Sequence, residues 1–322
     1  MQGGWGRLTG PTLAVDAGQT ETRAALHGEH GPRLARGPGV GRMDAAAGGT
    51  NGVVTTLLRA LSALEPLPAA PAALGVGLSG MEAARTDELE RLGDALHRAL
   101  RPRRIAIASD GVTSLFGALA GAPGVVVSAG TGTVALAHDG ERWARVDGWG
   151  SLLGDAGSAF AIGRAGLDAA LREHDGRGGS PALLRSAERE LGPAAHIVSR
   201  IHRTGAAATT VAGFAPVVVE EAAAGDAVAT EIVRGAGREL AVSAATALRR
   251  AFGTDEPVPV SYAGNVFRAG APLLEPFERE LAERCPRAEL VPPRGDALAG
   301  AGMLAARAGT LRPAPGLVWV AG

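Results

Sequence analysis

The sequence contains no lysine, so all of its 32 basic residues are arginine. A Walker-type phosphate loop, a pyridoxal Schiff base and a lysine general base all need an ε-ammonium group, and these three kinds of site are therefore excluded. Asparagine is almost as scarce and occurs only at Asn51 and Asn265. If the chain binds a nucleotide, it must do so without a Walker lysine.

Cysteine, net charge and long apolar runs are also lacking. Cys285 is the only cysteine, which excludes an intrachain disulfide and any zinc or iron-sulfur site built from several thiolates of one chain. The net charge of -1 provides no broad field for nucleic acid or anionic membranes. No secretory pattern and no apolar run of spanning length is found. We expect a cytoplasmic protein that binds neither nucleic acid nor membrane.

A chain of 322 residues is long enough for two lobes, each with a core of its own. The first part predicts a meander of three short strands, followed by alternating helices and strands, which is typical of a mixed α/β sheet. The expected strands cover residues 12–16, 22–27, 33–36, 73–78 and 105–108, and the expected helices cover residues 53–64 and 87–100.

The same pattern starts again near residue 121, with a second three-strand meander over residues 125–128, 133–138 and 142–146. Helical sequence then dominates residues 157–252, a strand follows at 258–262, and the chain returns to helix at 296–308. We therefore predict an N-terminal lobe over residues 1–120, a larger and more helical C-terminal lobe over 121–308, and a tail over 309–322. The tail is an irregular or crossing segment that is expected to return to the N-terminal lobe.

Each predicted meander contains a turn rich in glycine and threonine. Residues 16–22 read DAGQTET and residues 128–133 read SAGTGT. Gly18 can adopt positive φ, and backbone N–H groups and threonine hydroxyls in such a turn are donors for an anion. One turn alone is equally compatible with an ordinary polar hairpin. Because the chemistry occurs at matching places in both meanders, we interpret the two turns as a phosphate-binding pair.

These turns belong to an ordered set of motifs that resembles the BadF/BadG/BcrA/BcrD ATPase family of the sugar kinase, Hsp70 and actin superfamily, and in particular its N-acetylglucosamine kinases. Besides the turns, the motifs are Ser109-Asp-Gly111, Gly148-Trp-Gly150, Gly154-Asp-Ala-Gly-Ser158 and Tyr262-Ala-Gly-Asn-Val266. The resemblance spans nearly the whole chain. It implies two ribonuclease-H-like lobes around a nucleotide cleft, with Mg-ATP held by hairpins from both lobes, and a small-molecule sugar as substrate. We also expect a homodimer.

The resemblance implies a role for each matched residue. Asp110 would take the proton of the sugar hydroxyl as general base, and Asp16 would hold Mg²⁺ through water. The other nucleotide contacts implied are Gly18, Gln19, Thr20, Thr22, Gly130, Thr131, Gly132, Thr133, Gly264, Asn265 and Gly300. The sugar contacts implied are Ser79, Gly80, Asp110, Thr131, Gly148, Trp149 and Asp155.

Several of these residues have a purely structural alternative. Ser109 or Asp110 is equally suited to cap the helix that follows, and Asp155 to cap the helix that begins near Gly157. An isolated Trp such as Trp149 belongs in a core more often than at a site. Alanine and glycine around Gly300 also mark close helix packing.

The chain departs at three places from the pattern of the family that it resembles. It has no Asn near residues 40–43, where the family has a sugar-contacting amide, and it has Ala156 where the family often has Glu. Asp147 occupies the first position of the usual Gly-Gly-Trp-Gly motif. Our hypothesis is that this carboxylate favours a substrate with a free ammonium group, such as glucosamine.

Within this resemblance, we predict phosphorylation of N-acetylglucosamine to its 6-phosphate. Glucosamine and N-acetylmuramic acid are the alternative substrates. The alternatives of another class are an ATPase activator of the redox type and a nucleotide-dependent regulator. Cys285 alone cannot supply a dimer with the four thiolates of a shared iron-sulfur cluster. The ROK kinases are disfavoured because their cysteine cluster and Glu-x-Gly-His pattern are absent.

Overall fold

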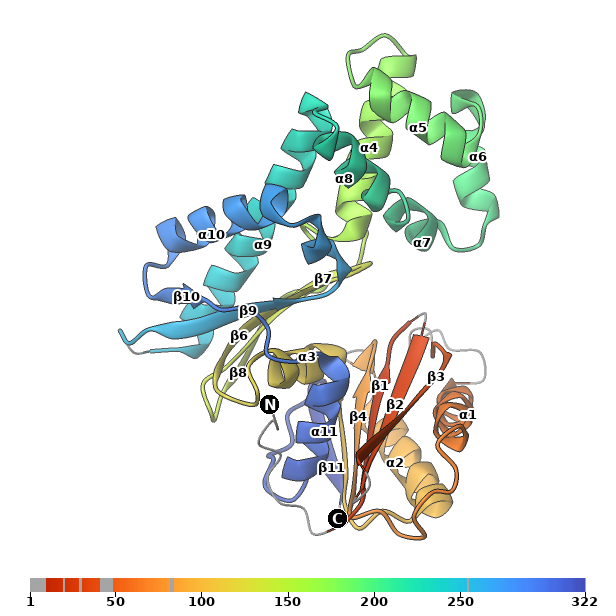
Figure 1. Cartoon of the computed structure of the whole chain (residues 1–322), viewed down its shortest axis with the longest axis vertical. Coiled ribbons are helices and arrows are strands. Elements are labelled where there is room, and N and C mark those ends of the chain that lie inside the picture. The colour runs from red at the N-terminus through yellow and green to blue at the C-terminus, as the bar shows by residue number, and fades with distance from the viewer. Residues whose placement is uncertain are drawn as a thin grey trace. The chain divides into compact units, whose positions relative to one another are not determined.

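The computed structural model describes residues 10–19, 21–28, 31–40, 49–81, 84–253 and 255–321. The chain divides into two compact units. Unit 1 contains residues 1–123 and 292–322, and unit 2 contains residues 124–291. Figure 1 labels the elements of both units, which are described here one at a time.

A six-stranded mixed sheet forms the centre of unit 1, with the order β11-β5-β4-β1-β2-β3. Strands β1, β2 and β3 form the predicted antiparallel meander, and β4 and β5 continue the sheet in parallel with β1. The strands are β1 (Thr12–Ala17), β2 (Glu21–Gly28), β3 (Gly31–Pro38), β4 (Ala73–Leu78), β5 (Ile105–Ser109) and β11 (Val318–Ala321).

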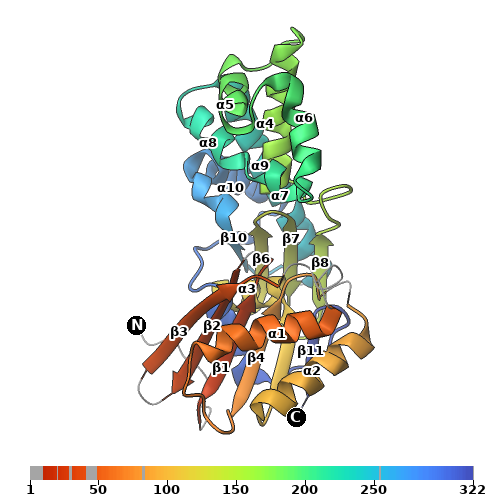
Figure 2. The ribbon, with the colours of Figure 1, turned by 90° about the vertical axis from the view of Figure 1, so that its right-hand side faces the viewer.

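Four helices cover the two faces of this sheet, with α1 and α2 on one face and α3 and α11 on the other (Figures 1 and 2). Helix α2 buries leucines at positions 89, 92, 96 and 100, the spacing that places apolar side chains on one helical face. The helices are α1 (Gly49–Ser62), α2 (Thr86–Leu100), α3 (Asp110–Ala118) and α11 (Ala297–Arg307).

Two glycines in the buried strand β4 allow α3 and α11 to pack closely against the sheet. A Cβ at Gly77 would lie 2.6 Å from Oγ1 of Thr113 in α3, and one at Gly75 would collide with the carbonyl of Ala301 in α11. Gly75 and Gly77 share a face because side chains alternate along a strand. The two glycines of β4 therefore allow α3 to lie close to the carboxyl ends of the strands.

Unit 2 repeats the strand order of unit 1. Its sheet has the order β10-β9-β6-β7-β8, with β6, β7 and β8 as an antiparallel meander and β9 and β10 parallel to β6. The strands are β6 (Gly124–Ala129), β7 (Thr133–His138), β8 (Trp143–Asp147), β9 (Val258–Ala263) and β10 (Ala288–Leu290). The predicted duplication of one meander is confirmed.

Three helices of unit 2 begin at a residue whose side chain caps the helix. Ser158, Ser180 and Asp226 accept hydrogen bonds from backbone N–H groups in the first turns of α4, α5 and α9. The helices are α4 (Ala159–His174), α5 (Pro181–Leu191), α6 (Ala194–Arg203), α7 (Ala207–Ala212), α8 (Ala215–Ala223), α9 (Ala227–Ala251) and α10 (Ala271–Arg284), with the 3-10 helix η3 (Asn265–Ala269). Unit 2 is the longer and more helical unit, as predicted.

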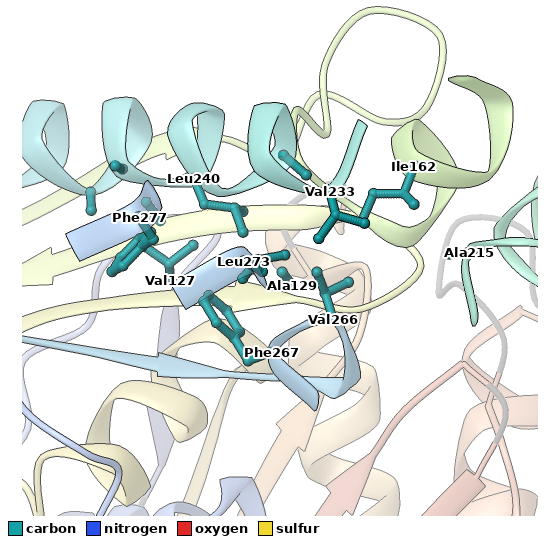
Figure 3. Packing of buried hydrophobic residues seen from close by; sticks show 14 of the residues in the cluster. Val127, Ala129, Ile162, Ala215, Val233, Leu240, Val266, Phe267, Leu273 and Phe277 are labelled. Carbon is teal, nitrogen blue, oxygen red and sulfur yellow. The ribbon is translucent and has the colours of Figure 1, made fainter. Parts of the chain in front are cut away.

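Helices α9 and α10 pack on the sheet of unit 2 and form its core with η3. Leu240 of α9 lies over Val127 of β6, and the aromatic rings of Phe267 and Phe277 meet edge to face with centroids 5.8 Å apart (Figure 3). Strand β6, which leads into the second glycine-rich turn, is therefore held by a continuous apolar cluster.

The C-terminal segment belongs to unit 1. Helix α11 packs against α3, β1 and β4, and β11 pairs antiparallel with β5. The indole of Trp319 lies against Gly93 of α2. The sequence predicted a second lobe extending to residue 308, whereas the structure ends unit 2 at Val291, because the apolar face of α11 is buried on the first sheet.

No single helix in the described part of the chain is both long and apolar enough to cross a membrane. The stretches Ala207–Ala223 and Ala227–Ala251 reach that threshold only as a pair, and they are bent by 118°.

Candidate active site

The first glycine-rich turn joins β1 to β2. Its backbone is closed by the N–H of Gly18, which donates to the carbonyl of Glu21 over 3.0 Å. Two further bonds fasten it: Val40 donates to the carbonyl of Gly18 and Ser79 to that of Ala17. Thr20, a predicted nucleotide contact, and residues 41–43, where the chain lacks the Asn expected from the family, lie outside the described residues.

The second turn joins β6 to β7 and is fastened to the start of α4. The N–H of Gly130 donates to the carbonyl of Gly132 over 2.9 Å, so this turn is closed like the first. The first two N–H groups of α4, from Ala159 and Phe160, donate to the carbonyls of Gly130 and Thr131. The carbonyls of the turn are thereby occupied by a helix start, whose N–H groups have no partner within the helix.

A buried threonine closes each of the two hairpins. Thr22 pairs with Ala17, and Thr133 pairs with Ala129. The two threonines are 0% and 3% exposed, and the hydroxyl of each lacks a hydrogen-bond partner among the described atoms. A buried hydroxyl without a partner carries a desolvation cost, which a bound acceptor would remove. The structure therefore gives both turns the same feature, an unsatisfied hydroxyl, at equivalent positions.

Asp16 lies near the end of β1 and contacts Arg23 of β2. Oδ2 of Asp16 accepts from Nε and Nη2 of Arg23 over 3.1 and 2.5 Å, and Nη1 of Arg23 donates to Asp296 over 2.6 Å. Burial raises the pKa of Asp16 above its usual value, and the guanidinium of Arg23 opposes this only in part. Asp16 is therefore a carboxylate whose charge is only partly compensated in the protein.

The surroundings of Asp16 are compatible with a hydrated cation. In the part of the chain that the structure describes, no three His, Cys, Asp or Glu side chains are grouped as a metal cage. Mg²⁺ at phosphate sites is commonly held by one or two carboxylates together with water and phosphate oxygens. Asp16, a carboxylate that Arg23 compensates only in part, fits such a site as a single protein ligand.

Asp110 is the first residue of α3 and follows directly on β5. Its neighbour Ser109 is the N-cap of the helix, with its hydroxyl accepting from the N–H of Val112 over 3.4 Å. Capping therefore does not account for Asp110. A carboxylate in the first turn of a helix is favoured by the helix dipole, and the carboxyl ends of parallel strands are where such sheets bind ligands.

Ser79 and Gly80 follow β4, the strand between β1 and β5. Ser79 is buried, and its N–H donates to the carbonyl of Ala17 over 3.1 Å, which ties this loop to the first turn. Gly80 has a φ of 77°, a conformation that suits glycine. In unit 1, the predicted residues Asp16, Ser79 and Asp110 thus lie at the carboxyl ends of three adjacent parallel strands, β1, β4 and β5.

The predicted sugar segment is the loop from residue 147 to 157, between β8 and α4. Asp155 is 8% exposed and has a φ of 61°. Its carboxylate lies against the second turn, since a Cβ at Gly132 would be 2.7 Å from Oδ2 of Asp155. Ser158 rather than Asp155 caps α4, so the capping alternative does not apply to Asp155.

Trp149, in the same loop, is 73% exposed and is not a core residue. The guanidinium of Arg145 lies over its ring at 5.6 Å from the centroid and donates to the carbonyl of Gly148 over 2.6 Å. Arginine over an aromatic face is a favourable contact. One face of the indole is thus held by Arg145.

Asp147 does not have the surroundings that the ammonium hypothesis needs. Its carboxylate accepts from the backbone N–H groups of Gly148, Asp155 and Ala156, over 2.8, 2.8 and 2.9 Å. Both oxygens are therefore engaged within the loop. This geometry does not support Asp147 as a ligand for a free ammonium group on the substrate.

The predicted adenosine contacts lie in two different units. Gly264, with a φ of 96°, follows β9 in unit 2 and passes close to the carbonyl of Ala129, and Asn265 begins η3. Gly300 instead lies inside α11 of unit 1, where a Cβ would collide with the carbonyl of Thr113 in α3. Close helix packing explains Gly300, and its role at the nucleotide stays a prediction without support from this geometry.

Sequence reasoning missed Arg23 and Ser128. Arg23 follows the first motif by one residue, and in a strand its side chain lies on the face of the register partner Asp16. Ser128 is the counterpart of Asp16 in the second hairpin, and its buried hydroxyl also lacks a partner among the described residues. Aligning the two hairpins on Ala17 and Ala129, the last residues of their first strands, would have placed Ser128 opposite Asp16.

Two units of one strand order, each opening on a closed turn with a buried threonine, define a protein of the two-lobed, actin-like nucleotide-binding class. The structure of a proposed N-acetylglucosamine kinase from Chromobacterium violaceum superposes with a TM-score of 0.70 at 29% identity, covering 92% of this chain and 98% of the other. A ROK family glucokinase from Streptomyces griseus shares the fold, with a TM-score of 0.54 at 16% identity over 92% and 98% of the two chains.

The chain belongs to the BadF/BadG/BcrA/BcrD ATPase family, whose model matches residues 13–305. An N-acetylmuramic acid/N-acetylglucosamine kinase from Clostridium acetobutylicum is 27% identical over 236 residues, which cover 72% of this chain and 76% of that protein. An N-acetyl-D-glucosamine kinase from Dictyostelium discoideum is 25% identical over 316 residues, or 91% and 97% of the two chains.

Proposed function

We propose that this chain transfers the γ-phosphoryl group of ATP to the 6-hydroxyl group of N-acetylglucosamine, with Asp110 as the general base. The broader statement, that the chain is an ATP-dependent sugar kinase, rests on its family and on relatives that are sugar kinases. The single observation that carries the proposal is the pair of matched hairpins, each with a buried and unsatisfied threonine hydroxyl.

Each unit contributes a different kind of group to the proposed reaction. In unit 1, Asp110 accepts the proton of the sugar hydroxyl, and Asp16 orients water around Mg²⁺. In unit 2, the turn from Gly130 to Thr133 binds phosphate oxygens through its N–H and hydroxyl groups. When Mg²⁺ is bound, it neutralises charge that develops on the phosphate oxygens.

In unit 2, Asp155 orients the sugar. It is a buried carboxylate that lies against Gly132 of the phosphate turn, which suits a group that must hold a hydroxyl at a fixed distance from a phosphate. Positioning of this kind supplies much of the rate enhancement in phosphoryl transfer.

N-acetylmuramic acid is a second candidate substrate, because one similar kinase is named for both sugars. Glucosamine is not favoured by the structure, since the carboxylate of Asp147 is engaged by backbone N–H groups.

The test is a turnover assay with Mg-ATP and five sugars: N-acetylglucosamine, N-acetylmuramic acid, glucosamine, N-acetylmannosamine and glucose. ADP release and the mass of the sugar product are followed together. With N-acetylglucosamine, we expect a product about 80 Da heavier than the sugar, because one phosphoryl group has been transferred. Release of ADP without a phosphorylated sugar would instead indicate an ATPase activator or regulator, and the proposal would fail.

A further inference from the structure

The loop from residue 147 to 157 has an unusual backbone. Asp147 and Asp155 have φ values of 62° and 61°, two of the four positive values among the non-glycine residues that the structure describes. Gly148, Gly150 and Gly157 also have positive φ. L-residues rarely adopt this conformation, and it persists only where the surroundings enforce it.

The carboxylate of Asp147 provides that enforcement. It accepts from Gly148 at the beginning of the loop and from Asp155 and Ala156 at its end, so a single side chain joins the two ends. Hydrogen bonds to an ionised acceptor are stronger than those between neutral groups. Gly154 leaves the space that this requires, because a Cβ there would lie 2.5 Å from Oδ1 of Asp147 and 2.9 Å from Cβ of Trp149.

Asp147 itself is placed by the sheet. It is the last residue of β8 and pairs with Val134 of β7, the residue that follows Thr133 of the phosphate turn. The hydrogen bond from the N–H of Asp155 thus connects the buried Asp155 carboxylate, through Asp147, to the same strand pair that carries the phosphate turn.

We infer that Asp147 is a positioning residue, which fixes the backbone of the 148–156 loop and thereby the carboxylate of Asp155 for the sugar. This inference rests on the proposed function. Asp147 does not touch the substrate, and it acts through Asp155 and not by discriminating between amino and N-acetylamino groups.

The experiment compares Asp147→Ala, Asp147→Asn and a matched control, Asp139→Ala. Asp139 lies at the opposite end of the β7–β8 hairpin, and its carboxylate likewise accepts from two backbone N–H groups, those of Glu141 and Arg142. Asp139→Ala therefore reproduces the loss of a turn-bracing carboxylate in the same unit, at a place distant in sequence from Asp155.

Two readouts are needed, one of them independent of activity. Calorimetric sugar binding should weaken in Asp147→Ala by about 10- to 100-fold, as expected when hydrogen bonds to a charged group are lost. Hydrogen exchange of the amides of residues 148, 155 and 156 should accelerate. Asp147→Asn tolerates positive φ and keeps one acceptor oxygen, so it should recover part of both effects.

A double variant adds a test of the contact with Gly154. Gly154→Ala should weaken sugar binding in the wild-type background and have a smaller effect in the Asp147→Ala background, because both changes disturb one contact. If Asp147→Ala binds the sugar like the wild type, or if Asp139→Ala weakens binding equally, the inference is wrong. If the wild type phosphorylates no sugar, the proposed function fails instead.

Discussion

Both glycine-rich turns are closed by a glycine N–H, which donates to Glu21 in the first turn and to Gly132 in the second, but the two hairpins carry different charges. Each is closed by a glycine N–H and by a threonine with a buried, unsatisfied hydroxyl. Asp16 in the first hairpin corresponds to Ser128 in the second. The first turn is fastened by the N–H groups of Val40 and Ser79, whereas the second is fastened to the start of α4. The repeated sequence thus gives similar hairpins, and a single difference gives a carboxylate to the first hairpin and a hydroxyl to the second.

The same asymmetry holds at the carboxyl ends of the parallel strands. Strand β5 of unit 1 is followed by Asp110, whereas its counterpart β10 is followed by Val291 and Pro292. Both carboxylates proposed to serve the chemistry therefore lie in unit 1. The groups proposed in unit 2 are the hydroxyl and backbone groups of its turn, and Asp155 for the sugar.

The largest effect is expected from Asp110→Asn, which removes the proposed base but keeps the size of the side chain. The kcat for sugar phosphorylation should fall by about 10²- to 10⁴-fold, the usual range for general-base catalysis. Asp94→Asn is the control, because Asp94 is an exposed carboxylate on α2 of the same unit. A near-normal kcat in Asp110→Asn would refute the assignment of the base.

Asp16→Asn and Ser128→Ala test the difference between the turns directly. Asp16→Asn should lower kcat/KM by about 10- to 100-fold and raise the Mg²⁺ concentration needed for half-maximal rate, as is typical when a group that orients metal-bound water is lost. Ser128→Ala should change neither quantity more than about twofold, since it removes one neutral hydroxyl. Equal losses in both variants would contradict the assignment of the cation to the first turn.

Thr22→Val and Thr133→Val test what the two turns share. Each change replaces a hydroxyl by a methyl group in a strand, where valine is favourable. Loss of a hydrogen bond to phosphate should weaken ATP binding by about tenfold in each variant, measured by calorimetry. The free energy of unfolding without nucleotide should rise by about 1 kcal/mol or more, because a buried unsatisfied group is removed. Lower stability in either variant would mean that its hydroxyl has a partner in the free protein.

The smallest effect is expected at Asp139, in the turn between β7 and β8. Burial favours a higher pKa for Asp139, but the N–H groups of Arg142 and Glu141 and the Arg142 side chain outweigh it and lower this pKa below 3.8. Asp139 therefore stabilises the fold above its unfolded pKa, and that stabilisation is lost as the pH falls through its folded pKa. Urea unfolding of the wild type and Asp139→Asn should differ at pH 7, and the difference should disappear as the pH falls through and below the folded pKa of Asp139. A difference that persists at low pH would contradict this assignment.

The sequence predicted the strands of both meanders because short apolar runs bounded by glycine-rich turns are local signals. It predicted that the tail returns to the N-terminal lobe, but not that Val318–Ala321 form a strand of the first sheet, since these four residues pair with β5 across more than 200 positions of chain. The predicted end of the second lobe, residue 308, was wrong for the same reason: the contacts of α11 are made with residues far away in the sequence. An amphipathic helix such as α11 shows which residues it buries but not the surface that buries them.

The candidate site residues were likewise predictable from the sequence only in part. Asp16, Asp110 and Asp155 were recognisable because they lie in motifs next to glycines. The role of Asp147 was misread, because a carboxylate in a substrate motif looks like a ligand until its partners are known. Its three partners are backbone N–H groups, and these carry no sequence signal.

By itself, the sequence determined that this protein has no lysine-based phosphate site, that one meander occurs twice and that each copy carries a turn rich in glycine and threonine. These properties depend on residue identity and local spacing. Only the tertiary structure decided which threonine hydroxyls are left unsatisfied, that Ser109 and Ser158 rather than the aspartates cap their helices, and that Asp147 braces the loop of Asp155. Each of these depends on which polar groups meet once the chain is folded, because a buried group is stabilised by its actual partners and not by its neighbours in sequence.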